Sequence, residues 1–156
     1  MLELYLLRHA KAKREGEKLP DAERPLSQRG RCQAAAMAPA LMRWGALEGE
    51  VVSSPARRTR ETLEAMAEAL PEGTPAPVAH FDEALYTFDG EALRAWLQTL
   101  PEGSRRLLVV GHNPALLELA RWLSPVAPDS LPTGGLLHLR LPGESWQALK
   151  KHAAEE

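Results

Sequence analysis

Two stretches of the chain decide its fold: LELYLLRH at residues 2–9 and LLVVGHNP at residues 107–114. Each begins as an apolar run typical of a buried strand, and each reaches a histidine, His9 in the first and His112 in the second. In an open α/β sheet, ligands bind at the edge where the carboxyl ends of the strands meet. We therefore expect the two imidazoles to face each other across one pocket.

A third strand-like segment carries basic residues to the same edge. The sequence VVSSPARR at residues 51–58 has a short apolar run, then Ser54 and Pro55, which predict a helix start with a cap followed by a first-turn proline. This start places Arg58 in the first helical turn, close to the end of the strand. Because Arg8 directly precedes His9, at least two arginines and two histidines should converge.

The remaining sequence predicts strands and helices in alternation, the pattern of a sheet covered on both faces. Helices are predicted at residues 27–45, 54–70, 93–100 and 114–124. A short strand is expected within residues 75–80, and alternating residues at 137–141 predict a last strand that turns at 142–145 into residues 146–149. We expect an α/β fold, a three-layer αβα sandwich whose mostly parallel central sheet has an antiparallel edge hairpin.

Length and charge narrow the class of protein. With 156 residues, the chain suits a single domain spanning residues 1–156. The net charge of -2 gives no reason to expect a nucleic acid or an anionic membrane as partner. No apolar run is long enough for a membrane span, no signal peptide is recognisable, and the one cysteine, Cys32, excludes an internal disulfide. A cytoplasmic location is the expectation.

The predicted cluster suits phosphoryl transfer through a histidine. A neutral imidazole can attack phosphorus, and arginines supply fixed charge for the phosphoryl oxygens, so Arg8 and Arg58 would also help to keep His9 unprotonated. We expect neither a metal nor a cofactor. Of the other histidines, His138 is expected to face solvent, and none of His80, His138 and His152 has a partner at metal-ligand spacing. Walker-type loops, Gly-x-Ser-x-Gly elbows and cysteine phosphatase loops do not occur in the sequence.

In these residues the chain resembles the histidine phosphatase, or phosphoglycerate mutase-like, superfamily. The likeness rests on LLRH at 6–9, on Ser53-Ser54-Pro55 with Arg58 and Thr62, and on VVGHNP at 109–114. The short length and RPLS at 24–27 with Gly30 are similar to SixA-type phosphohistidine phosphatases. The resemblance implies that His9 is the phosphorylated nucleophile, that Arg8 and Arg58 hold the phosphate, and that His112 binds it and assists transfer.

One departure from the family concerns the general acid. Many phosphomonoesterases of the superfamily have a glutamate in a Leu-x-Glu context after the third strand, where this chain has LYT at 85–87. Glu83 or Asp82 could substitute, although an exposed loop position is the ordinary interpretation of both. An alkoxide leaving group needs a proton more than imidazole does, so a weakened acid favours a phosphoramidate substrate.

We therefore predict a phosphatase that hydrolyses phosphohistidine on a protein through a covalent phospho-His9 intermediate. A phosphatase for a small phosphomonoester, with Glu83 or Asp82 as acid, is the alternative within the family. A phosphate-binding or interaction module without turnover is the alternative from another class. The polar segment 11–23 beside the site could select substrate or cover the pocket, and the sequence leaves the substrate, pathway and oligomeric state open.

Overall fold

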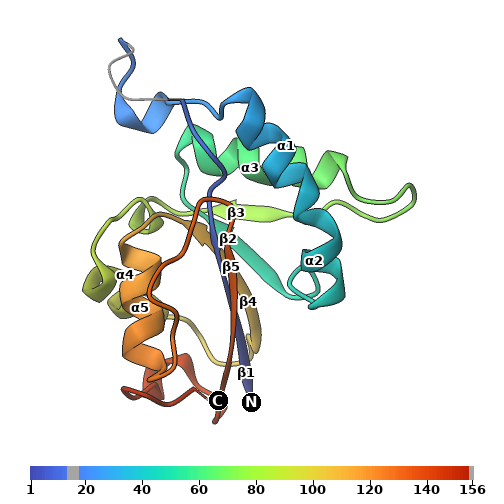
Figure 1. Cartoon of the computed structure of the whole chain (residues 1–156). Helices are drawn as coiled ribbons and strands as arrows, with labels where there is room; N and C mark the ends of the chain where they lie inside the picture. The colour runs from blue at the N-terminus through green and yellow to red at the C-terminus, as the bar shows by residue number, and fades with distance from the viewer. Residues whose placement is uncertain (14–17, 155–156) are drawn as a thin grey trace.

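The computed structural model describes residues 1–13 and 18–154 and is built on a five-stranded sheet (Figure 1). The strands are β1 (Leu2–Arg8), β2 (Glu50–Ser53), β3 (Ala79–Phe81), β4 (Arg106–Gly111) and β5 (Leu136–Leu141). Their order is β3-β2-β4-β1-β5, and every pair is parallel except β1 with β5. The mostly parallel sheet with an antiparallel edge confirms the predicted fold class.

Helices cover both faces of the sheet (Figure 1). Helices α4 (Gly90–Leu97) and α5 (Ala115–Leu123) pack on one face. Helices α2 (Ala38–Arg43) and α3 (Arg57–Glu68) pack on the other, with α1 (Gln28–Ala36) against α3. Three short 3-10 helices complete the described elements: η1 (Asp21–Glu23), η2 (Glu83–Leu85) and η3 (Trp146–Ala148). Within the described residues, no helix has both the length and the apolar composition needed to cross a membrane.

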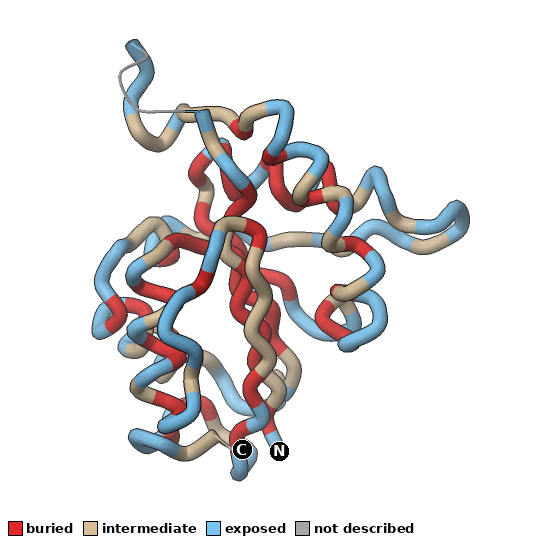
Figure 2. Tube along the Cα trace, in the orientation of Figure 1, coloured by how far each residue is buried: buried red, intermediate tan, exposed pale blue. Residues whose placement is uncertain are grey.

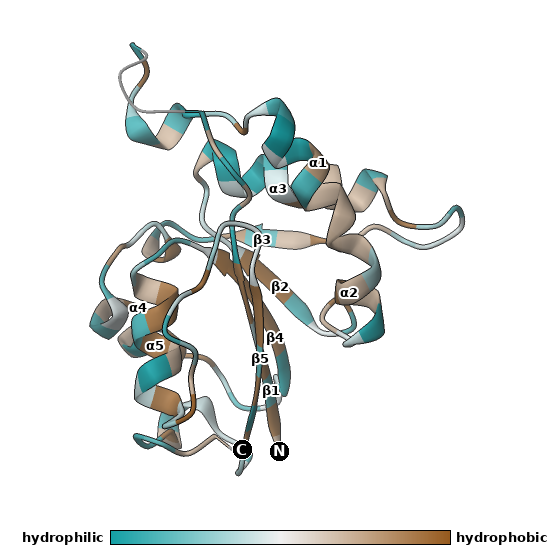
Figure 3. Cartoon of the chain, viewed as in Figure 1, coloured by the Kyte–Doolittle hydropathy of each residue, from teal (hydrophilic) through white to brown (hydrophobic). Residues whose placement is uncertain are grey.

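Alternate residues of the central strands supply two separate cores. Leu4 and Leu6 of β1 pack with the α4 and α5 side, whereas Tyr5 and Leu7 pack with the α2 and α3 side. Figures 2 and 3 show these central strands as buried and hydrophobic along most of their length. Because both faces of β1 and β4 are covered, their sequences are continuous apolar runs, and the polar residues begin where the strands end.

The segment between β2 and α3 differs from the prediction. Helix α3 begins at Arg57 with Ala56 as its N-cap residue, not at the Ser54-Pro55 pair. The Ser54 hydroxyl instead accepts a hydrogen bond from the Ala56 backbone N–H at 3.3 Å. Ser54 therefore does not cap α3, and its hydroxyl can also contact residues outside this segment. Arg58 lies in the first turn of α3, as predicted. Strand β3 begins at Ala79 and ends at Phe81, near the carboxyl end of the predicted range.

Strand β5 lies at the predicted place, but residues 146–149 do not form the predicted returning strand. Strand β5 pairs with β1, and the segment expected to close a hairpin forms η3, which buries Trp146 and directs its indole N–H to the Ser104 carbonyl at 2.7 Å. The prediction for His138 was also wrong: its ring stacks on Tyr5 and hydrogen-bonds to Glu3 instead of facing solvent. Burial of Trp146 favours a compact turn over an extended edge.

The helix predicted at 27–45 forms two helices. Ser27 caps α1 as expected, with its hydroxyl accepting from the Gly30 N–H at 3.0 Å. The break falls at Met37, and Pro39 lies in the first turn of α2, where its missing N–H costs nothing. The same Ser27 donates from its hydroxyl and its backbone N–H to the carbonyl of Lys11, two residues after His9. Helix α1 is thereby fixed to the segment that follows the first predicted site residue.

Helix α1 lies so close to the backbone of Lys11 at Gly30 that a substitution there tests the contact. A Cβ at this buried position would lie 2.0 Å from the Lys11 carbonyl oxygen. We expect Gly30→Ala to lower the free energy of unfolding by about 1–3 kcal/mol through overpacking. Arg29→Ala, on the exposed side of the same turn, should change it by less than about 0.5 kcal/mol. Urea denaturation measures both, and equal values for the two variants would contradict this account of α1.

Candidate active site

His9 lies immediately after β1 with one of its ring nitrogens fixed. Its Nδ1 atom is 2.7 Å from the carbonyl oxygen of Ala10. A carbonyl oxygen can only accept, so Nδ1 carries the proton in the neutral ring and Nε2 carries the lone pair. Among the described residues, no side chain or backbone group hydrogen-bonds to Nε2. The buried imidazole of His9 therefore presents Nε2 as a nucleophilic nitrogen.

His112 follows β4, and its ring centroid lies 5.4 Å from that of His9, which confirms that the two strand ends meet. The Nδ1 atom of His112 is 3.2 Å from an Nη2 atom of Arg58, and Nε2 is 2.8 Å from the Ser54 hydroxyl. Arginine can only donate, so Nδ1 accepts from it and the Nε2–H of the neutral ring donates to Ser54. The serine that sequence analysis treated as a helix cap orients this histidine.

Arg58 occupies the first turn of α3 with a guanidinium that is only 1% exposed. Its Nη1 donates to the Asp21 backbone carbonyl at 2.7 Å, and its Nη2 donates to the Asp21 carboxylate at 3.0 Å. One turn later, Thr62 donates its hydroxyl proton to the Arg58 carbonyl at 2.7 Å and accepts from the Ala10 N–H at 3.0 Å. Thr62 thus fixes the start of α3 to the residue after His9.

Arg8 adds a second cation at the end of β1. Its Nη1 donates to the Leu131 carbonyl at 2.9 Å. The buried Nε atoms of Arg8 and Arg58 have no hydrogen-bond partner among the described residues. Leaving a buried donor unpaired costs free energy, and guanidinium N–H groups bind phosphate oxygens well. These two donors favour an anionic ligand in the site.

A glycine pair before β5 holds the segment that carries Arg8 and His9. The Gly134 N–H lies 3.1 Å from the Arg8 carbonyl and 3.0 Å from the His9 carbonyl, and the Arg8 N–H donates to the Gly135 carbonyl at 3.0 Å. Gly134 has a φ of 72°, in the left-handed region that favours glycine. Both candidate residues of β1 are therefore fixed by backbone contacts on the β5 side.

Three residues join this site that sequence analysis did not place there: Asp21, Arg24 and Tyr86. The Asp21 carboxylate accepts from Arg58, from Arg24 at 3.1 Å and from the Tyr86 hydroxyl at 2.5 Å. Asp21 and Arg24 belong to the polar segment 11–23 and its continuation, of which residues 14–17 lie outside the described structure. The available signal was the i,i+3 charge pair between Asp21 and Arg24, the first residue of the RPLS motif. Tyr86 is the middle residue of LYT at 85–87, directly before the position where the family has its acid.

Burial, together with the nearby arginines, keeps both histidines neutral. The pKa of His9 is lowered to about 4, mainly by burial; the hydrogen bond to Ala10 opposes this shift, and the nearby Arg58, Arg8 and Arg24 add to it. Burial also lowers the pKa of His112 to about 3, together with Arg58. Burial opposes ionisation of Asp21, but hydrogen bonds from Tyr86 and Arg58 outweigh it and lower its pKa to about 2. At neutral pH the site holds neutral imidazoles, cationic guanidinium groups and one carboxylate.

Asp82 and Glu83, the two residues considered as general acid, differ in their contacts. Asp82 caps η2, accepting from the Ala84 N–H at 2.9 Å, and its other oxygen accepts from the Trp96 indole at 3.0 Å. Glu83 is exposed, and its side chain forms no hydrogen bond or ion pair with any described residue. Asp82 therefore has a structural role at η2 and α4, and the carboxylate that contacts Arg58 is Asp21.

Arg57, the other arginine at the start of α3, lies outside the site. Arg57 is exposed and pairs with Glu61 at 3.1 Å, so it does not join Arg58 in the site. The described part of the chain contains no group of three or more His, Cys, Asp or Glu residues arranged to hold a metal ion.

Comparison with known proteins agrees with this geometry. Residues 4–102 match the model of the histidine phosphatase superfamily, branch 1. An uncharacterised chloroplastic protein of Arabidopsis thaliana is 34% identical over 92% of this chain and 68% of its own length. An uncharacterised protein of Picosynechococcus is 30% identical over 91% of this chain and 82% of its own length.

Solved structures with the same fold include three SixA proteins. SixA from Agrobacterium tumefaciens is 26% identical with a TM-score of 0.75, covering 88% of this chain and 90% of that one. SixA from Nakamurella multipartitia is 28% identical with a TM-score of 0.74, covering 99% and 92%. A protein histidine phosphatase SixA in complex with tungstate is 26% identical with a TM-score of 0.72, covering 90% and 88%. With its strand-end histidines and buried arginine, the chain belongs to the histidine phosphatase superfamily and is of the SixA type.

Proposed function

We propose that this protein is a phosphatase that hydrolyses phosphohistidine on another protein through a phospho-His9 intermediate. The observation that carries the proposal is the Nδ1 hydrogen bond from His9 to the Ala10 carbonyl, because it leaves Nε2 unprotonated and free. A buried ring whose pKa is lowered to about 4 stays in this nucleophilic form at neutral pH. No metal or cofactor takes part in the proposed chemistry.

In the first step, the Nε2 lone pair of His9 attacks phosphorus and forms a P–N bond. The bond from phosphorus to the substrate imidazole breaks, and its electron pair returns to the imidazole nitrogen. The substrate ring leaves as neutral imidazole if its other nitrogen is already protonated. Arg8 and Arg58 would stabilise the charge on the phosphoryl oxygens, the main task of a protein in such a transfer. Their unpartnered Nε atoms support this role.

In the second step, water attacks the phosphorus of phospho-His9. A water proton passes to a base, the P–N bond to His9 breaks, and inorganic phosphate leaves. We assign the base to Asp21, whose carboxylate hydrogen-bonds to the same Arg58 guanidinium that faces His112. Its pKa of about 2 means that Asp21 is ionised at neutral pH, the form that can accept a proton.

The state of the carboxylates supports a phosphoramidate over a phosphomonoester. The alcohol of a phosphomonoester leaves as an alkoxide unless a general acid protonates it. A carboxyl group with a pKa of about 2, such as that of Asp21, is ionised at neutral pH and has no proton to donate. The oxygens of Asp82 are already hydrogen-bonded to Ala84 and Trp96. Imidazole needs less assistance because phosphohistidine can carry the required proton on its own ring.

The structural neighbours support the same class of substrate. SixA bound to tungstate, a tetrahedral oxyanion like phosphate, is described as a protein histidine phosphatase. The family model matches residues 4–102, and we propose that the whole chain, residues 1–156, forms a single histidine phosphatase domain. The proposed partner is a phosphohistidine-bearing protein, and the cytoplasm remains the predicted location.

The direct test compares substrates without added metal. We expect hydrolysis of a phosphohistidine protein to be much faster than that of sugar and aryl phosphomonoesters. His9→Ala should reduce hydrolysis by at least about a thousandfold, because it removes the nucleophile. Phosphate release is the measurement. Preference for a sugar phosphate would assign the protein to the phosphomonoesterases, and no turnover on any of these substrates would favour a binding module.

Asp21 and Glu83 can be separated by matched amide variants. Asp21→Asn should slow steady-state hydrolysis of phosphohistidine by about a hundredfold or more, because it removes the base for the second step. Binding of inorganic phosphate should persist in this variant, since the substitution removes a negative charge beside Arg58. Glu83→Gln should retain the parent rate. Loss of rate in Glu83→Gln with a normal Asp21→Asn enzyme would reverse the assignment.

A further inference from the structure

Phe88 is a large apolar side chain that remains 48% exposed beside a buried histidine of the site. Its ring centroid lies 5.3 Å from that of His112, and the two planes are tilted by 55°. Tyr86 lies at a similar distance from His112, 5.4 Å, and meets Phe88 edge-on at 5.9 Å. Two aromatic rings therefore adjoin the ring of His112, and the outer one has a surface open to solvent.

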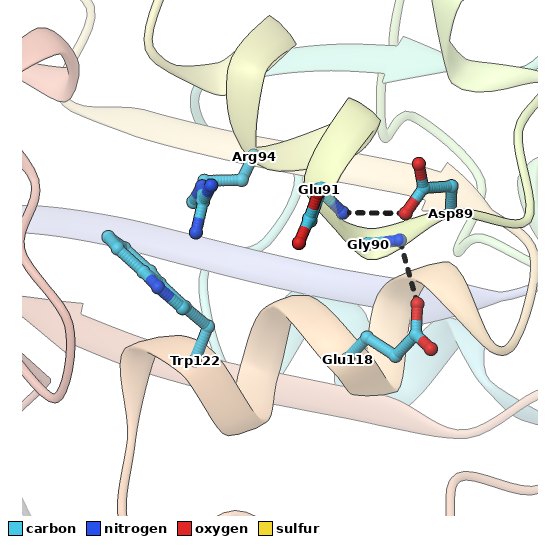
Figure 4. A pocket seen from close by; sticks show the side chains of 6 residues that line it. All are labelled: Asp89, Gly90, Glu91, Arg94, Glu118 and Trp122. Atoms are coloured by element: carbon cyan, nitrogen blue, oxygen red, sulfur yellow. Dashed lines mark hydrogen bonds between the residues drawn. The ribbon is translucent and has the colours of Figure 1, made fainter.

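The backbone on both sides of Phe88 is held in place. The Asp89 N–H donates to the Thr87 hydroxyl at 3.2 Å, and the Asp89 carboxylate accepts from the Glu91 N–H at 3.0 Å. The next N–H, that of Gly90, donates to the Glu118 carboxylate on α5 at 2.8 Å (Figure 4). These contacts fix the start of α4 to α5, so the residue just before them has a defined position.

Gly90 shows how close this attachment is. A Cβ at Gly90 would lie 2.4 Å from the Cβ of Glu118, so α4 and α5 approach each other more closely here than a side chain allows. Farther along the two helices, the Arg94 guanidinium lies 4.7 Å from the Trp122 ring centroid. Figure 4 shows the two side chains next to each other. An aromatic side chain presented from such a fixed turn loses little conformational freedom when a ligand binds to it.

The leaving group must lie on the side of phosphorus opposite the attacking nitrogen, because the transfer is in line. His9 and Phe88 each adjoin His112, at 5.4 Å and 5.3 Å between ring centroids. In the proposed mechanism, a leaving group directed away from His9 across His112 would reach the rings of Tyr86 and Phe88. Phe88 offers that group an aromatic surface and no hydrogen-bonding atom of its side chain.

We propose that Phe88, backed by Tyr86, is a stacking platform that selects an aromatic leaving group, the imidazole of phosphohistidine. The inference rests on the proposed function and adds the residue that recognises the substrate ring. A planar imidazole can pack against Phe88 in an offset or edge-on arrangement, which stabilises aromatic pairs. The hydroxyl groups of a sugar phosphate would gain no such contact and would lose water at this surface.

Binding of two non-hydrolysable probes tests the platform without requiring turnover. Isothermal titration calorimetry would compare phenylphosphonate with methylphosphonate, which share the anionic group and differ in the ring. We expect the parent protein to bind phenylphosphonate about 2- to 10-fold more tightly, the range expected for one aromatic pair. Phe88→Ala should bring this ratio close to one while leaving methylphosphonate affinity unchanged. Phe88→Leu, which keeps much of the apolar surface, should give an intermediate ratio.

A matched control uses Phe81, which is 50% exposed at the end of β3 and lies in a different surface hollow, with Arg60 and Leu63 of α3. Phe81→Ala should keep the parent ratio. The proposal would be overturned if Phe88→Ala left the ratio of phenylphosphonate to methylphosphonate affinity unchanged, or if this ratio were one in the parent protein. Methylphosphonate binding by Phe88→Ala shows that the anion site is still folded.

The same variants separate this inference from the proposed function. If the parent hydrolyses phosphohistidine, Phe88→Ala should lower kcat/KM for it by about 2- to 10-fold and leave the value for an alkyl phosphate unchanged. If the parent instead hydrolyses none of the phosphorylated substrates, the proposed function fails. The phosphonate ratio then still decides whether Phe88 recognises rings, because that ratio does not depend on His9 chemistry.

Discussion

The buried guanidinium of Arg58 is the group on which the organisation of the site depends. A charge that is 1% exposed must be compensated, and Arg58 is compensated by the backbone carbonyl and carboxylate of Asp21 and by a ring nitrogen of His112. These contacts connect the start of α3 with the segment at η1 and with the end of β4. Thr62 then extends the connection to the residue after His9. Helix α3 therefore positions both sides of the candidate site.

Burial, with Arg58 as a further cause, explains why two histidines can lie side by side and stay neutral. Burial and the neighbouring arginines disfavour an imidazolium at either ring, so each keeps one proton and one lone pair. The hydrogen-bond partners then decide which nitrogen is which: Ala10 fixes the proton of His9 on Nδ1, and Arg58 fixes the lone pair of His112 on Nδ1. Nε2 of His9 is free to act as the proposed nucleophile, whereas both ring nitrogens of His112 are hydrogen-bonded. Two identical side chains thereby take different roles.

Sequence alone located the parts of this site that lie at strand ends. His9, His112, Arg8 and Arg58 follow or end buried apolar runs, and parallel strands bring such positions to one edge of the sheet. The link between Arg58 and Asp21 joins residues 37 positions apart, and Tyr86 reaches Asp21 across 65 positions, so no local pattern predicts either contact. Ser54 was interpreted as a helix cap because Pro55 follows it, but the tertiary contact with His112 decides its role. The last strand, β5, lies where it was predicted. The segment expected to complete a hairpin with it forms η3 instead, and the buried Trp146 of η3 packs against the core.

The central claim is that His9 becomes phosphorylated during turnover. The most direct measurement is a rapid-quench reaction with a phosphohistidine protein, stopped in base because phosphohistidine survives there, and followed by peptide mass spectrometry of this protein. The account predicts a phosphoryl group on the peptide that contains His9, formed before inorganic phosphate is released and absent in His9→Ala. Hydrolysis of the substrate at full rate with no phosphoryl group on His9 at any time would contradict it.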